Sequence, residues 1–185
     1  MKKALGVKNC MYPMPVTLIG ANVDGKPNYI TIAHVGIMDF SHVCVSMGKV
    51  HYTNAGIKAN KAFSVNIPST DMVKETDYCG LVSGRKFDKG SVFETFYGKL
   101  ETAPMIEACP INMECRLALT VDMPNHDVFV GEIIEAYCEE DIVAGEDMVD
   151  FAKANPILFA MYDKSYFKLG ERFASAWSAG KELIK

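Results

Sequence analysis

Twelve consecutive residues, Ile111 to Asp122, alternate between apolar and polar or small side chains. The apolar residues stand at every odd position of this segment. A period of two residues predicts a long β-strand with one buried and one exposed face. Pro124-Asn125 marks a turn, and His126 to Glu139 predicts a second long strand that runs back beside the first. Two consecutive long strands favour a barrel or a strongly coiled sheet.

Shorter patterns predict further strands and a few short helices. Pro15 to Val23 and Pro27 to His34 are joined by Asp24-Gly25, a turn signal that predicts a β-hairpin. The other expected elements are strands over 43–47 and 63–67, helices beginning near Thr53 and covering 69–81 and 145–154, and a last hairpin over 157–162 and 166–169. No repeat or linker interrupts the 185 residues, so we expect one domain, residues 1–185, of mainly β class with short peripheral helices.

The composition of the chain limits which partners it can bind and in which compartment it is expected. The net charge is −4 without a block of like charges, which argues against nucleic acid or an acidic membrane surface as the main partner. Lys8 and Pro13 interrupt any signal peptide, and no apolar stretch is long enough to span a membrane. Six cysteines without a Cys-x-x-Cys pair favour free thiols and a cytoplasmic protein. The four histidines lack metal-ligand spacing, so no metal site is expected.

The stretch Ser46 to Thr53 combines the end of a strand, a polar loop and the start of a helix. Its hydroxyls, the Lys49 ammonium and the helix N–H groups are suited to bind a phosphate. The simpler alternative is a strand-to-helix corner that Thr53 caps. The basic loop 83–89 has two interpretations as well: it could contribute Lys89 to an anion site, or form a solvated connection after a helix that ends at Gly84.

Four segments in this order resemble the flavin reductase-like family of FMN-binding split barrels, and within it the flavoredoxin group. The segments are Pro15–Ile19 with Asp24–Asn28 and Ile30-Thr31, His51–Thr53 with Phe63–Pro68, Asp77–Gly80 with Ser83–Lys89, and His126–Ile133. The resemblance implies a homodimer of six-stranded Greek-key barrels, each of which binds one FMN near the subunit interface.

The same resemblance implies flavin contacts at Asn28, His34, Thr53, Lys89 and His126, together with an aromatic residue near the C-terminus, which would be Phe159 or Tyr162. His34 departs from the pattern, because the family often has a tryptophan there. The full set of candidate cofactor-binding residues is Asn28, Thr31, His34, Ser46, Met47, Lys49, Thr53, Lys89, His126 and Phe159.

These roles have simpler alternatives. His126 could be an ordinary solvated residue at a strand edge, and His34 a partly buried, hydrogen-bonded histidine. Lys89 could lie at the phosphate or at the reduced ring of the flavin. No catalytic acid or base is assigned, because the flavin would carry the chemistry.

The expected function is that of an FMN-binding oxidoreductase. It would be either a flavin reductase that takes hydride from NAD(P)H or a flavoredoxin-like carrier that takes electrons from a redox protein. Two alternatives remain at this point. One is a non-enzymatic module that binds flavin or haem on the same barrel, and the other is a barrel that has lost its cofactor.

Overall fold

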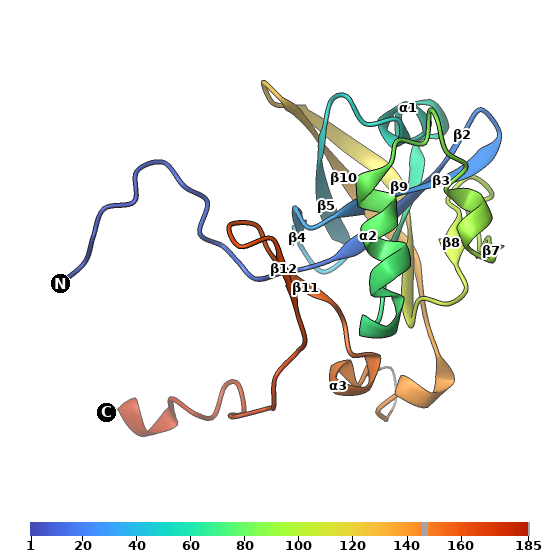
Figure 1. Ribbon diagram of the computed structural model, residues 1–185. Helices are drawn as coiled ribbons and strands as arrows, with labels where there is room; N and C mark the ends of the chain where they lie inside the picture. The colour runs from blue at the N-terminus through green and yellow to red at the C-terminus, as the bar shows by residue number, and fades with distance from the viewer. Residues whose placement is uncertain (146–147, 185) are drawn as a thin grey trace.

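A curled antiparallel sheet forms the body of the molecule (Figure 1). The computed structural model describes residues 1–145 and 148–184. The main sheet has seven strands in the order β3-β2-β6-β9-β10-β5-β4. Their bounds are β2 Thr17–Val23, β3 Lys26–Ile32, β4 Val35–Ile37, β5 His42–Gly48, β6 Ala62–Ile67, β9 Ile111–Asp122 and β10 His126–Cys138. The predicted mainly β fold is confirmed, with the three-residue β4 as a seventh strand beside β5.

Strands β9 and β10 are the long central pair of this sheet. The register shifts twice along the pair, between Val130 and Gly131 and between Ile133 and Glu135. Such bulges increase local twist and bend the strands. At Gly131 the ring of Phe63 leaves no room for a Cβ atom, so only glycine lets this ring pack against the strand. The bends therefore help to curl the sheet around its apolar interior.

Two smaller sheets and several short helices complete the fold. One small sheet has the order β1-β11-β12, and the other pairs β7 with β8. The strand bounds are β1 Met14–Pro15, β7 Thr95–Phe96, β8 Met105–Ile106, β11 Leu158–Ala160 and β12 Ser165–Phe167. The α-helices are α1 Thr53–Asn60, α2 Val73–Leu81 and α3 Phe151–Ala154, and the 3-10 turns are η1 Thr70–Met72, η2 Gly90–Val92, η3 Glu140–Ile142 and η4 Lys181–Leu183.

One helix prediction and one alternative interpretation need correction. The helix expected over 145–154 is only the short α3, and residues 146–147 lie outside the described part of the chain. Helix α3 begins at Phe151 because the preceding Asp150 caps it: its Oδ1 accepts hydrogen bonds from the backbone N–H groups of Ala152 and Lys153, at 3.0 and 3.2 Å. The helix expected over 69–81 is present as η1 followed by α2, which ends at Leu81, so the alternative in which a helix ends at Gly84 is wrong.

The apolar core lies inside the curl of the sheet, and a second cluster fills the space between the sheet and α2. The first cluster comprises Ile19, Ala21, Ile30, Ile32, Val45, Met47, Ile57, Phe63, Val65, Cys115 and Phe129. The second comprises Leu18, Tyr29, Met72, Cys79, Ile106 and Cys109. All six cysteines are free thiols; Cys79, Cys109 and Cys115 are buried, Cys44 is half-buried, and Cys10 and Cys138 are exposed. Within the described residues, no helix has the length and apolar character needed to cross a membrane.

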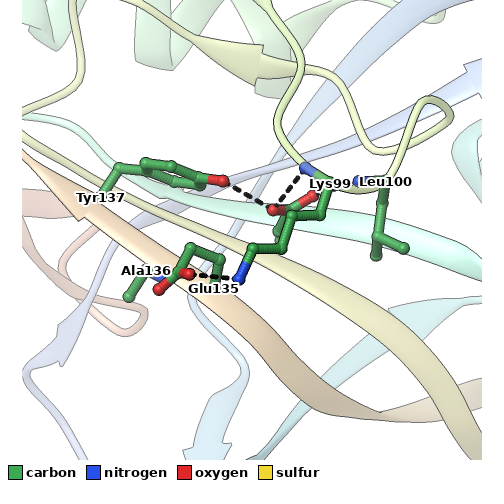
Figure 2. Close-up of polar contacts among 6 residues, drawn as sticks. Lys99, Leu100, Glu135, Ala136 and Tyr137 are labelled. Carbon is green, nitrogen blue, oxygen red and sulfur yellow. Dashed lines mark hydrogen bonds and ion pairs between the residues drawn. The ribbon is translucent and has the colours of Figure 1, made fainter.

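One buried carboxylate breaks the alternation expected for β9. Glu114 is fully buried although its position belongs to the polar face. Its Oε1 accepts hydrogen bonds from the Lys99 N–H and the Tyr137 hydroxyl, both at 2.8 Å, and its Oε2 accepts from the Leu100 N–H at 2.6 Å. Figure 2 shows Tyr137, Lys99 and Leu100 around this site, with Glu135 beside them at the Lys99 ammonium. The loop around Lys99 thus covers the outer face of β9.

Candidate functional site

Two adjoining cavities form a groove where β3 and β5 end and β10 begins. The first, of about 290 Å³, is lined by Val16, Thr31, Ile32, Ala33, His34, Ser46, Gly48, His51, Gly80, His126, Phe159, Met161 and Tyr166. The second, of about 230 Å³, is lined by Ile30, Val50, His51, Tyr52, Thr53, Gly80, Leu81, Val82, Ser83, Gly84 and Lys89. His51 and Gly80 line both cavities, so we call the two together the histidine groove.

Three imidazoles face the first cavity. The ring centroids of His34 and His126 are 6.3 Å apart. Burial lowers the pKa of His34 below its ordinary value, and the nearby His126 lowers it further. Burial also lowers the pKa of His51, with smaller contributions from Lys89 and His126. At neutral pH His34 and His51 are therefore neutral, and each ring can offer one N–H donor and one nitrogen acceptor.

Aromatic rings close the far end of the first cavity. The Tyr12 hydroxyl lies 2.8 Å from Nε2 of His34, and the Tyr12 ring packs edge-on against Phe159 and Tyr162. Tyr166 donates a hydrogen bond to Asp77 of α2 at 2.7 Å, which ties the last hairpin to the helix. Phe159 lines the cavity, whereas Tyr162 packs behind it on Tyr12. Between the two aromatic candidates, the geometry therefore favours Phe159.

The second cavity begins at the first residue of α1. Thr53 is buried, and its Oγ1 accepts a hydrogen bond from Nδ2 of the equally buried Asn28 at 2.7 Å. The Thr53 hydroxyl makes no cap to the helix, contrary to the simpler interpretation of this corner. The next two backbone N–H groups donate to carbonyls of the preceding loop, at 3.3 and 3.2 Å. The helix start therefore offers fewer free donors than the sequence suggested.

Lys89 reaches the same cavity from the basic loop. Its Nζ donates hydrogen bonds to the carbonyl oxygens of Cys79 and Val82, at 3.0 and 3.3 Å, at the C-terminal end of α2. A cation is favourable there because the last carbonyls of a helix carry partial negative charge. Burial lowers the pKa of Lys89. An ammonium group has three N–H donors, so one remains for another acceptor in the groove.

A third cavity, of about 370 Å³, continues from Lys89 and is lined by Val23, Asp24, Lys26, Pro27, Asn28, Tyr52, Gly84, Arg85, Lys86, Phe87, Asp88 and Lys89. The Arg85 guanidinium lies 5.3 Å from the centre of the Tyr52 ring. The Tyr52 hydroxyl donates to Asp24 at 2.9 Å. The basic loop is thus held against α1, with its cations around the donor end of the groove.

Two of the ten candidate residues lie away from these cavities. Met47 is fully buried in the apolar core, because neighbouring residues of a strand point to opposite faces and Ser46 and Gly48 face the groove. Lys49 forms an ion pair with Asp122 at the end of β9. Neither side chain is brought to the groove, so the phosphate-binding role expected for Lys49 finds no support in its position.

His51 was absent from the candidate set, yet it lines both cavities. The available signal was its place inside the stretch Ser46 to Thr53, directly before α1. Gly80, Met161 and Tyr166 also line the groove. Gly80 ends the family segment Asp77–Gly80, whereas no local pattern marks Met161 or Tyr166. Within the described residues, no three His, Cys, Asp or Glu side chains gather as a metal site requires.

The groove can accommodate a molecule with two different ends. One end has flat aromatic and imidazole walls at Phe159 and His34, and the other has a hydroxyl at Thr53 and an ammonium at Lys89. Flat walls with a few placed donors favour an aromatic ring system that carries an anionic group.

Comparison with known proteins shows to which family the chain belongs. The model of the flavin reductase like domain matches residues 9–168. The crystal structure of flavoredoxin from Methanosarcina acetivorans superposes with a TM-score of 0.94 at 45% identity, over 99% of this chain and 100% of that one. Flavoredoxin of Desulfovibrio vulgaris (Miyazaki F) gives 0.91 at 33% identity, over 98% and 100%. An FMN-binding protein from Thermus thermophilus, with bound 1-cyclohex-2-enone, shares the fold at 0.81 and 21% identity, over 95% and 97%. The chain belongs to the flavin reductase-like family.

Proposed function

We propose that the chain binds FMN in the histidine groove and acts as a flavin-dependent oxidoreductase. The observation that carries this proposal is the continuous wall between Phe159 at one end and Lys89 at the other. FMN has a flat ring and a phosphate with about two negative charges. The aromatic end suits the ring, and the hydroxyl and ammonium suit the phosphate. Membership of the family and the similarity to two flavoredoxins support a flavin.

Bound FMN would supply the hydride or electron transfer. The side chains of the groove hold and orient it. Lys89 has one N–H left after its two helix carbonyls, and this donor is available to an anion. The neutral imidazoles of His34 and His51 can each donate and accept a hydrogen bond. They therefore suit the polar edge of a flavin, which carries donors and acceptors together.

The electron source divides the proposal into two forms. As a flavin reductase the protein would take hydride from NAD(P)H, and as a flavoredoxin-like carrier it would take electrons from a redox protein. A module that only stores flavin needs the same groove, so the groove does not separate it from an enzyme. Reduction kinetics do separate them.

The visible spectrum of the purified protein, before and after NADH and then NADPH under anaerobic conditions, tests these forms. Rapid bleaching of a flavin spectrum by a nucleotide supports the reductase and names its donor. Bleaching by dithionite alone supports the carrier or the storage module. Absence of flavin, even after addition of FMN, would refute the proposal.

Thr53→Val tests the donor end of the groove, because it removes the hydroxyl while it keeps the shape. We expect FMN affinity to fall by about tenfold, since a hydrogen bond to a charged group contributes about 1.5 kcal/mol or more. Lys49→Ala is the matched control, since Lys49 lies outside the groove at Asp122 and its loss should leave the affinity unchanged. Titration of apoprotein with FMN measures both. Equal affinity of the two variants would place the phosphate elsewhere.

A further inference from the structure

The third cavity, which continues from Lys89, is larger than either cavity of the histidine groove, at about 370 Å³ against about 290 and 230 Å³. It is continuous with the groove, because Tyr52, Gly84 and Lys89 line both the second and the third cavity. The hydrogen bond from Asn28 to Thr53, at 2.7 Å, joins a residue that lines the third cavity to one that lines the second. The donor end of the groove therefore opens into a further space.

Two glycines let the basic loop pack closely beside this opening. A Cβ atom at Gly84 would collide with the amide oxygen of Asn28 and the ring of Tyr52. A Cβ atom at Gly90 would collide with the carbonyl oxygen of Pro27. The loop between the two glycines is therefore held against β3 and the start of α1, and its side chains form one wall of the third cavity.

The third cavity has more cations than its own carboxylates neutralise. Its charged lining residues are Asp24, Lys26, Arg85, Lys86, Asp88 and Lys89. Both carboxylates already accept hydrogen bonds, Asp24 from the Tyr52 hydroxyl at 2.9 Å and Asp88 from the Ser91 N–H at 3.2 Å. Among the ion pairs of residues 1–145 and 148–184, none includes one of these four cations. A cavity with surplus positive charge favours an anionic ligand.

Arg85 and Phe87 supply the two kinds of contact that a nucleotide needs. The Arg85 guanidinium lies 5.3 Å from the centre of the Tyr52 ring, and the only hydrogen bond that Arg85 donates to a side chain within the described residues comes from its backbone N–H, to the Ser83 hydroxyl at 3.4 Å. The planar fork of guanidinium donors matches two oxygens of a phosphate. The Phe87 ring lines the same cavity and is 50% exposed, so it offers a flat surface on which a base can stack.

We propose that the third cavity binds the adenylate half of FAD, with its phosphate at Arg85 and its purine at Phe87. The proposal rests on the flavin site proposed above, because in FAD the adenylate is joined to the flavin phosphate, which that site places at Thr53 and Lys89. FMN ends at this phosphate, so it gives the cations of the third cavity no partner. In FAD the second phosphate follows the first directly, which matches the continuity of the second and third cavities at Lys89.

Calorimetric titration of the apoprotein with FMN and with FAD tests the proposal without any turnover. We expect FAD to bind at least as tightly as FMN. Arg85→Gln should weaken FAD about tenfold and leave FMN within about twofold, because it removes a charge-assisted contact that only FAD makes. Phe87→Leu keeps an apolar side chain but removes the flat ring, and should weaken FAD alone by about fivefold or more. Lys74→Ala removes an exposed cation of α2 outside all three cavities, and as the control it should change neither affinity.

Free nucleotides identify the source of the adenosine phosphate. We expect 5′-AMP to compete with FAD and hardly with FMN, because it would occupy the third cavity alone. NADPH also carries an adenosine phosphate, but this group is not joined to the flavin. In a parallel titration, 2′,5′-ADP should therefore compete with FAD no better than 5′-AMP does.

The outcomes separate failure of this inference from failure of the proposed function. An apoprotein that binds neither flavin refutes the flavin site itself. Binding of FMN together with much weaker binding of FAD overturns the adenylate site alone, and so does an FAD affinity that neither Arg85→Gln nor Phe87→Leu changes. Equal losses of FMN and FAD in Arg85→Gln would place Arg85 at the flavin phosphate. Binding of 2′,5′-ADP that depends on Arg85 but does not displace FAD would assign the cavity to NADPH.

Discussion

Glu114→Gln is expected to destabilise the protein by about 3 kcal/mol. The carboxylate accepts three hydrogen bonds in the fully buried space between β9 and the loop around Lys99. A glutamine amide can accept on its oxygen only, so its NH₂ group must face the N–H of Lys99 or that of Leu100. One charge-assisted bond worth about 1.5–3 kcal/mol is lost, and a donor that stays unpaired adds about 1–3 kcal/mol. Because the volume is unchanged, no cavity contributes.

Urea and thermal unfolding of the variant measure this loss. For a chain of this size, about 3 kcal/mol lowers the melting temperature by roughly 6–12 °C. The matched control is Glu135→Gln, since Glu135 contacts the ammonium of the same Lys99 at 2.6 Å but is exposed (Figure 2). Its midpoint should stay at the wild-type value, because exposed ion pairs contribute little. Tyr137→Phe removes one of three donors to Glu114 and should fall between the two.

The order of the three variants is the decisive result. If Glu114→Gln unfolds within about 1 kcal/mol of the wild type, which is less than the combined cost of a lost charge-assisted bond and an unpaired donor, the loop does not depend on this carboxylate. If Glu135→Gln costs as much as Glu114→Gln, the surface charge and not the buried acceptor holds the loop. A Tyr137→Phe variant as unstable as Glu114→Gln would assign the effect to the ring of Tyr137.

Two further predictions concern titration. The Lys58 ammonium, 2.8 Å from Asp127, holds the pKa of that carboxyl below its usual value, so this stabilisation exists above about pH 4 and is lost as the pH falls further. Between about pH 5 and pH 3, the usual range of a carboxyl titration, the urea midpoint of Asp127→Asn should therefore fall less than that of the wild type. If the two midpoints fall in parallel, the ion pair does not stabilise the fold. His126→Asn should raise the pKa of His34, because it removes the neighbouring imidazole that helps to lower it, but burial should keep that pKa below its ordinary value. An NMR titration of His34 that shows no change would exclude the coupling.

The sequence was most informative where structure depends on local pattern. The alternation from Ile111 to Asp122 gave the bounds of β9 without error, and the turn at Asp24-Gly25 gave the β2–β3 hairpin. Period and turn chemistry act between near neighbours, so a single chain displays them. The same alternation assigned Glu114 to a solvated face. Its burial depends on the loop at Lys99, which is close in space and shows no period of its own.

The candidate site could be predicted only in part, because its residues come from segments that lie far apart in the sequence. The family motifs led to His34, His126 and Phe159, which the fold brings to one cavity. Membership of the stretch Ser46 to Thr53 predicted cofactor contacts less well. The alternation of side chains along the strand turns Met47 into the core, and Lys49 forms an ion pair with Asp122 instead. A motif identifies which segments meet, but the geometry of each strand decides which side chains of those segments point into the groove.

The burial of three of the six cysteines limits how this protein can be damaged. Burial raises the pKa of Cys79 to about 11 and that of Cys115 to about 12, and it raises the pKa of Cys109 as well. Their sulfurs are protonated at neutral pH, whereas peroxide and alkylating reagents attack the thiolate. Cys10 and Cys138 lie at the surface, where such reagents arrive first. The buried thiols therefore react slowly because they stay protonated, and oxidation of this protein should begin at the cysteines on its surface.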